Sequence, residues 1–103
     1  MDKIVFVKLS PATAKGKKMK MEFYNKDKKR LATRQFGFSG ASDFTKHGDT
    51  ARRDRYDTRH KAREDWTAPL TNGALSKWIL WNKPSLSASF SDYRKRFNYK
   101  ELK

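Results

Sequence analysis

Cysteine is absent from this 103-residue chain, which excludes disulfide bonds and thiolate metal sites. Long hydrophobic runs are absent too. The apolar segments Ile4–Val7 and Trp78–Trp81 are far shorter than the about 20 residues that a membrane-spanning helix needs. The first of them is also too short for a signal peptide. We therefore expect a soluble protein without membrane contact, either intracellular or packaged inside a particle.

Acidic side chains are scarce. Eleven Asp and Glu stand against 25 Lys and Arg, which gives a formal net charge of +14. This excess repels itself in a compact state, so a polyanionic partner is expected. The excess is uneven: residues 1–39 hold eleven basic and three acidic side chains, residues 40–66 seven and six, and residues 67–103 seven and two. The arginine-rich segment 52–63 therefore lies in the part of the chain that is closest to neutral.

The size and composition indicate one folded domain. Hydrophobic residues at 36% and charged residues at 35% would favour disorder. However, three Trp, four Tyr and seven Phe can each bury a large area, enough for a small aromatic core. We predict a single α+β domain over residues 1–103, with a three-stranded antiparallel β-meander in 1–39 and three α-helices in 40–103.

Three segments of the first third have strand patterns. Ile4–Val7 is apolar and rich in β-branched residues, Lys18–Phe23 alternates strictly, and Leu31–Phe38 alternates with Gly37 as a candidate bulge. Proline, glycine and asparagine predict loops at Ser10–Gly16 and Asn25–Lys29. The predicted inward positions are Met19, Met21 and Phe23 on the second strand and Ala32, Arg34, Phe36 and Phe38 on the third.

The first predicted helix is polar. Asp49 or Thr50 caps it, and it runs to about Glu64. Two acid–base pairs spaced four residues apart support it, Asp49 with Arg53 and Asp57 with Lys61.

Two apolar helices follow. Thr71 or Asn72 caps a helix over Ala74–Trp81, which is apolar nearly all round and is predicted to be the buried centre. Pro84 ends it, because the residue before proline disfavours helix. Ser85 caps the last helix, whose apolar stripe consists of Leu86, Phe90, Tyr93 and Phe97. Two of the three helices are expected to cover the sheet.

Lysines crowd the predicted hairpin of the first third, on its second strand and in both neighbouring loops. Phosphate contacts need only mobile surface cations, and they give salt-dependent, sequence-independent affinity. We therefore predict nucleic-acid binding here and at the basic end of the last helix. The alternative is a solvated face that keeps the hairpin from pairing with other chains. The candidate residues are Lys15, Lys17, Lys18, Lys20, Lys26, Lys28, Lys29, Arg30, Arg94, Lys95 and Arg96.

A second basic group, Arg52, Tyr56, Arg59 and Arg63, aligns at helical spacing. Arginine beside an aromatic ring can bind phosphate and stack on a base. Interleaved acids argue against that role, because they can pair with the arginines within the molecule. We therefore expect a self-balanced surface helix, and we expect replacement of the hairpin lysines to weaken binding more than replacement of these arginines.

Aromatic and histidine residues offer two further candidate sites. Trp66, Trp78 and Trp81 could form a stacking platform, but their apolar surroundings favour the core. His47 and His60 have carboxylates nearby, which could bind a metal or perform acid–base chemistry. No third strong ligand, glycine-rich phosphate loop or nucleophile motif accompanies them. We predict no metal, no cofactor and no enzymatic activity, with His47 as a local cap or hydrogen-bonding residue.

Ordered sequence blocks extend from Ser42 to Phe97, over more than half of the chain. The strongest is the continuous block Gly73–Pro84. The others are Ser42–Thr45, His47, Asp49, Arg55–Tyr56, Arg59–Lys61, Glu64–Trp66, Pro69–Thr71, Ser85–Leu86, Ala88–Ser89, Asp92–Tyr93 and Arg96–Phe97.

In these blocks the chain resembles a family of small, basic, uncharacterised proteins encoded by large double-stranded DNA viruses of the phycodnavirus, marseillevirus and mimivirus type. It departs from the family at Gly48, where a lysine beside the histidine is usual, and its strand region is only loosely similar. The resemblance implies a viral origin rather than a mechanism. It favours a virion or genome-associated protein over a cellular ribosomal protein.

Charge and resemblance together predict a small, non-enzymatic viral protein that binds nucleic acid, with DNA as the expected partner, largely independently of sequence. It would reside in the host cytoplasm or nucleus during infection, or in the virion interior. The alternative is a minor capsid or core protein, or one that binds a host protein, with no direct nucleic-acid role.

Overall fold

The strand patterns of the first third form a sheet in the computed structural model, which describes residues 3–40 and 43–102. Strands β1 (Phe6–Pro11), β2 (Met19–Tyr24) and β3 (Arg30–Phe36) form the predicted antiparallel meander. β1 starts later than predicted and continues through Ser10 and Pro11, where the sequence pattern predicts a loop. Proline is tolerated there because it ends β1 on a stretch of edge that β4 does not reach.

A fourth strand, β4 (Lys100–Glu101), lies parallel to β1 and was not predicted. The Lys100 N–H donates to the Val5 carbonyl at 2.9 Å, and the Leu102 N–H donates to the Val7 carbonyl at 2.9 Å. The sheet is therefore mixed, with the order β3-β2-β1-β4. A two-residue strand of charged residues is too short to carry a period-two pattern, so it could not be predicted from the sequence.

The third strand ends at Phe36, two residues before its predicted end. The irregularity in its pairing lies opposite Phe23 and Tyr24 rather than at Gly37. Gly37 instead turns the chain off the sheet with φ of 80°, and a Cβ there would lie 2.8 Å from the Leu80 side chain. Phe38 consequently leaves the core face on which it was predicted, and it is 72% exposed.

The helical part begins with a short helix that was not predicted, α1 (Phe44–His47), and continues with α2 (Thr50–His60). Asp49, one of the two predicted candidates, caps α2 by accepting from the Ala51 and Arg52 N–H groups. α2 ends at His60 rather than near Glu64. The three residues after His60 are all exposed, so no packing sustains further turns.

The second half contains α3 (Asn72–Leu75), the π-helical segment η1 (Ser76–Leu80) and α4 (Leu86–Phe97). Ser85 caps α4 as predicted, and Thr71, one of the two predicted candidates, caps α3. Single π-turns of this kind are frequent at functional sites.

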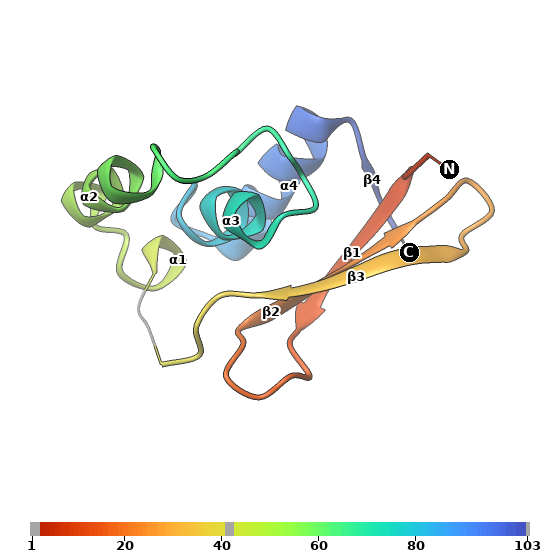
Figure 1. Cartoon of the computed structure of the whole chain (residues 1–103), viewed down its shortest axis with the longest axis horizontal. Coiled ribbons are helices and arrows are strands. Elements are labelled where there is room, and N and C mark those ends of the chain that lie inside the picture. Colours follow the sequence, from red (N-terminus) through yellow and green to blue (C-terminus); the bar gives the residue numbers. More distant parts are fainter. Residues whose placement is uncertain (1–2, 41–42, 103) are drawn as a thin grey trace.

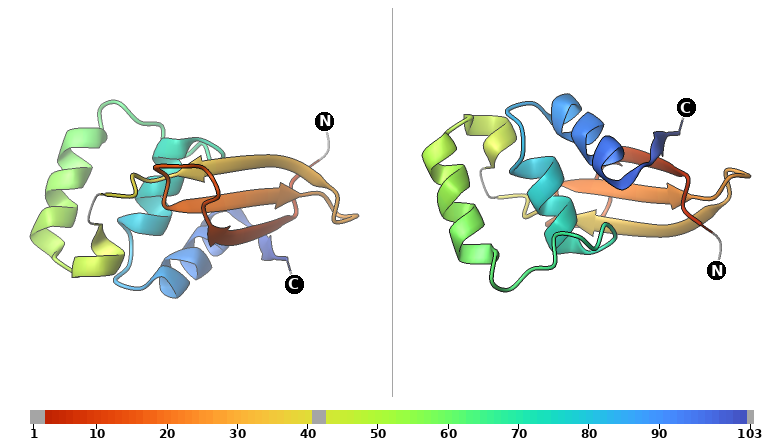
Figure 2. Two further views of the ribbon diagram at one scale, coloured as in Figure 1. Left: turned by 90° about the horizontal axis from the view of Figure 1, so that it is seen from below. Right: turned by 90° about the horizontal axis from the view of Figure 1, so that it is seen from above.

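The core lies between one face of the sheet and the pair formed by η1 and α4 (Figure 1). The other face of the sheet is not covered by any helix of the described residues, as the view from below in Figure 2 shows. α1 and α2 lie beyond the end of the sheet (Figure 1). The buried core consists of Val7, Met21, Phe23, Phe36, Leu75, Ile79, Leu80, Phe90 and Tyr93.

The three tryptophans lie at the margin of this core rather than inside it. Trp78 and Trp81 are half-buried and pack against the core cluster. The Trp78 indole N–H donates to the Trp66 carbonyl at 2.8 Å, which ties the segment before α3 to η1. The prediction that the tryptophans belong to the core is therefore only roughly right: Trp78 and Trp81 pack against the core without being buried in it, and Trp66 contacts Trp78 edge to face.

Candidate nucleic-acid interface

The lysines of the predicted hairpin do not form one surface. Lys15 and Lys17 lie in the β1–β2 loop, whereas Lys26, Lys28 and Lys29 lie in the β2–β3 turn. These two loops are at opposite ends of the six-residue strand β2, about 20 Å apart at the usual rise of a strand. All five side chains are exposed. Lys28 lies over the Phe6 ring, with its ammonium nitrogen 5.9 Å from the ring centroid.

Lys18, unlike these lysines, has a largely buried side chain and a structural role. Its ammonium group pairs with the Asp43 carboxylate, and the two side chains are only 9% and 3% exposed. Asp43 also accepts from the Thr45 N–H at 3.0 Å and so caps α1. This ion pair therefore fixes α1, and α2 behind it, to the start of β2.

Lys20 and Arg30 are engaged on the uncovered face of the sheet. Both pair with the Glu22 carboxylate, at 3.9 Å from the Lys20 nitrogen and 3.3 Å from the Arg30 guanidinium. The Tyr24 hydroxyl donates to the same carboxylate at 3.1 Å. Burial alone would raise the pKa of Glu22, but the hydrogen bonds from Tyr24 and Arg30 and the charges of Lys20 and Lys8 lower it below its usual value. Glu22 therefore stays ionised and neutralises part of this face.

Two of the three basic residues of α4 are used in packing. The Arg94 guanidinium lies 4.7 Å from the Phe90 ring centroid. That of Arg96 lies 3.7 Å from the Trp78 ring centroid and pairs with Asp92 at 3.3 Å. Lys95 is exposed. The predicted basic end of α4 therefore offers one unengaged cation rather than three.

The acids around α2 do not pair with its outward arginines, so the expected self-balanced helix is wrong. Asp49 caps the helix, Asp57 pairs with Lys77 at 2.7 Å, and Glu64 lies 3.7 Å from the His60 ring. Asp54 is 3.8 Å from Arg53, and Asp65 accepts from Thr67. Within the described residues, the ion pairs include none of Arg52, Arg55, Arg59 and Arg63.

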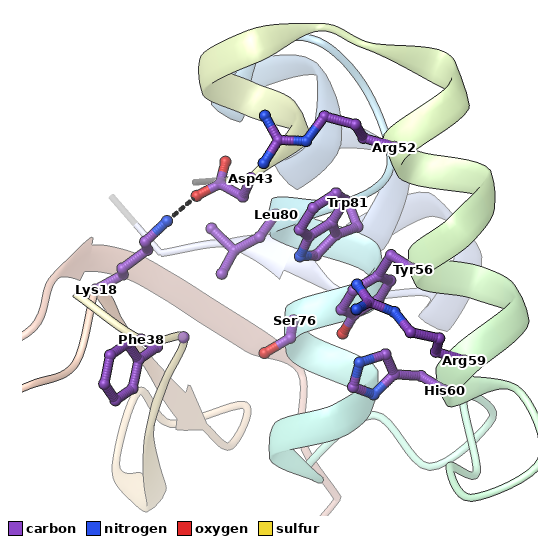
Figure 3. A pocket seen from close by; sticks show the side chains of 11 residues that line it. Lys18, Phe38, Asp43, Arg52, Tyr56, Arg59, His60, Ser76, Leu80 and Trp81 are labelled. Atoms are coloured by element: carbon purple, nitrogen blue, oxygen red, sulfur yellow. Dashed lines mark hydrogen bonds and ion pairs between the residues drawn. The ribbon is translucent and has the colours of Figure 1, made fainter. Parts of the chain in front are cut away.

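Two of these arginines line a cleft between α2 and the end of the sheet. Arg52 and Arg59 are on one wall, and Lys18 and Phe38 are on the other (Figure 3). Ser76, Leu80 and Trp81 lie between the walls, and the cleft has a volume of about 370 Å³. Exposed Lys17 lines an adjoining pocket that shares Gly37, Phe38, Tyr56, His60 and Ser76 with this cleft.

A column of stacked rings holds the α2 wall in place. The Tyr56 ring lies 4.4 Å from the Trp81 ring at an angle of 6°, and 4.2 Å from the His60 ring at 25°. Both faces of Tyr56 are therefore occupied. Burial raises the pKa of Tyr56 to about 12, so its hydroxyl is neutral at physiological pH. Tyr56 positions α2, and the column ends at His60.

Lys77 of η1 attaches α2 to the rest of the fold at a second place. It is buried, and its ammonium group lies 5.0 Å from the Trp66 ring centroid and 5.4 Å from that of Trp78 while it pairs with Asp57. With α2 fixed from its inner side by Lys77 and Tyr56, the arginines on its other positions stay available to a partner.

A family of unknown function (DUF5754) matches residues 7–60, more than half of the chain. The chain belongs to this family. The matched region extends from β1 to the end of α2 and contains Phe38, Arg52 and Arg59 of the cleft and Lys17 of the adjoining pocket. Comparison with curated proteins gave no match, and neither did comparison with solved structures.

The histidines contribute to local structure. The His47 Nδ1 accepts from the Asp49 N–H at 2.9 Å, which confirms its predicted role as a hydrogen-bonding residue at the junction before α2. Among residues 3–40 and 43–102, no three His, Cys, Asp or Glu side chains gather as metal ligands. In the same part of the chain, no helix has the length and apolar character to cross a membrane.

Proposed function

We propose that this protein is a non-enzymatic nucleic-acid-binding protein that contacts phosphates, largely independently of sequence, with DNA as its partner. The observation that supports this proposal most is that cations from separate elements line one cleft and the pocket that adjoins it. Arg52 and Arg59 come from α2, and Lys17 comes from the β1–β2 loop. None of the three has an ion-pair partner among the described residues. Like charges that lie close together on one surface repel each other unless an anion binds between them.

Three further exposed cations extend this surface. Lys15 lies in the same loop as Lys17, and Arg55 and Arg63 lie on exposed positions of α2 and the turn after it. Each phosphate that such a side chain neutralises releases a bound counterion, so affinity falls steeply with salt. The lysines of the β2–β3 turn lie at the far end of β2 and would contact a long strand or duplex at a second place.

The resemblance of residues 42–97 to proteins of large DNA viruses supports a proposal for where this binding takes place. A genome-associated protein inside a virion needs affinity for nucleic acid of any sequence, and phosphate contacts provide that. We therefore propose a protein of a large double-stranded DNA virus that acts in the host cytoplasm or nucleus or is carried in the virion. The alternative role, docking on acidic surfaces of capsid, core or host proteins, would use the same cations.

A salt series distinguishes these roles. Affinity for a random DNA duplex and a random single strand is measured by fluorescence anisotropy between about 50 and 300 mM NaCl. With four or five phosphate contacts, the log–log slope should be about −3 to −4.5, at about −0.7 to −0.9 for each contact. Absent binding at the lowest salt, or a slope near zero, would refute nucleic-acid binding and leave the protein-docking role.

A further inference from the structure

Phe38 is an unusual residue for the surface of a small domain. It is 72% exposed, although burying a phenylalanine is worth about 1.5–3 kcal/mol. The other large hydrophobic residue that is exposed in the described chain, Leu31, reaches only 37%. The domain therefore gives up burial of one aromatic ring, and that ring lies on the wall of the basic cleft.

The backbone around Phe38 is fixed on both sides. Before it, the Phe36 carbonyl accepts from the Lys18 N–H at 3.1 Å, and Gly37 takes a positive φ against Leu80. After it, the Ser39 N–H donates to the Gly16 carbonyl at 3.0 Å. These bonds join the segment 36–39 to the β1–β2 loop that carries Lys15 and Lys17. The ring is therefore presented from an ordered segment, beside the cations.

Across the cleft from the segment that carries Phe38, the lining offers groups that suit a nucleotide. Arg52 and Arg59 supply guanidinium groups for phosphates, and His60 ends the ring column (Figure 3). The Ser76 hydroxyl lies between the walls and can donate or accept one hydrogen bond, so it suits any base. The volume of about 370 Å³ is at the lower end of the range for small-ligand pockets, about 300–1,000 Å³.

Building on the proposed function, we infer that this cleft binds an unpaired nucleotide: its base stacks on Phe38 and its neighbouring phosphates lie on Arg52 and Arg59. A paired base cannot do this, because inside a duplex its faces are covered by the bases above and below. Aromatic rings beside a basic groove are the usual platform for single strands, and stacking tolerates every base. The protein would then bind single-stranded nucleic acid more tightly than duplex.

The test replaces the ring and leaves every charge in place. Wild type, Phe38→Ala and Phe38→Trp are titrated with a thymidine dodecamer, a uridine dodecamer and a duplex of equal length. We expect Phe38→Ala to weaken binding of single strands about 5- to 150-fold, which corresponds to about 1–3 kcal/mol for one stacked base. Duplex binding should change less than about twofold. Phe38→Trp should keep the wild-type affinity for single strands.

Leu31→Ala is the matched control, because it removes another exposed hydrophobic side chain far from the cleft. It should leave all three affinities unchanged. A strand carrying one 2-aminopurine gives a second measurement: stacking on Phe38 should quench its fluorescence, and Phe38→Ala should abolish that quenching. The pattern of variants should hold for the thymidine and the uridine strand alike, because stacking tolerates every base.

The outcomes separate this inference from the proposed function. If wild type binds neither strand nor duplex, the proposed function is wrong. If wild type binds both but Phe38→Ala changes neither affinity, or weakens strand and duplex equally, nucleic-acid binding stands and the base-stacking role of Phe38 is refuted.

Discussion

Replacing Lys18 by methionine should destabilise the fold much more than any other loss of a hairpin lysine. The substitution keeps a long apolar stem but removes the ammonium group that pairs with Asp43, whose side chain is 3% exposed. Breaking a buried pair from one side typically costs about 3–5 kcal/mol, because the remaining charge is left without a partner. Here the Thr45 N–H still donates to Asp43, so we expect a loss of about 2–4 kcal/mol.

The assay is urea denaturation at neutral pH, followed by the fluorescence of the three tryptophans. Lys17→Met is the matched control: it removes the neighbouring, exposed lysine and should change the free energy of unfolding by less than about 0.5 kcal/mol. Asp43→Asn completes a double-mutant cycle, because an asparagine can still cap α1. Lys18→Met combined with Asp43→Asn should be more stable than the sum of the single losses by about 1–3 kcal/mol. Equal effects of Lys18→Met and Lys17→Met, or strict additivity in the cycle, would refute a structural role for this pair.

Two further predictions concern stability. Gly37→Ala should cost about 1–3 kcal/mol in the same denaturation assay, because a Cβ at φ of 80° would be strained and would lie 2.8 Å from Leu80; a neutral result would contradict this tight turn. Glu22→Gln should destabilise the protein at pH 7 by about 1–2 kcal/mol. Since the folded-state pKa of Glu22 is lowered from 4.5, its contribution is fully present above that value and disappears as the pH falls through the lower folded pKa. The curves of wild type and Glu22→Gln should therefore converge in acid, and a constant difference between them would contradict the ion-pair network.

Local chemistry explains which parts of the fold could be predicted from the sequence. Asp49, Thr71 and Ser85 cap helices because a short polar side chain can satisfy the first N–H groups wherever a helix starts. The alternation of Met21 and Phe23 placed both on the buried face of β2. Each of these signals depends only on residues a few positions apart, so neither needed knowledge of the tertiary fold.

The partners of charged groups could not be predicted, because they come from distant parts of the chain. Asp57 was expected to pair with Lys61 within its own helix, yet it binds Lys77 of η1. Asp43 pairs with Lys18, which is 25 positions away in the sequence. With these acids engaged elsewhere, the arginines of α2 lose their expected counterions. Phe38 left the predicted core for a different reason: β3 ends at Phe36, and the turn at the neighbouring Gly37 breaks the alternation on which the prediction depended.

The most direct test of the central claim compares two variants of equal net charge. Arg52→Ala with Arg59→Ala removes two cations from the cleft, and Lys28→Ala with Lys29→Ala removes two from the distant β2–β3 turn. Affinity for single-stranded DNA is measured for both in the salt series. The cleft variant should bind at least about tenfold more weakly than the turn variant, and its log–log slope should be shallower than that of wild type by about 1.4, which corresponds to two lost phosphate contacts on a single strand. Wild-type affinity and slope in the cleft variant, with the loss confined to the turn variant, would contradict the claim that the cleft is the binding site.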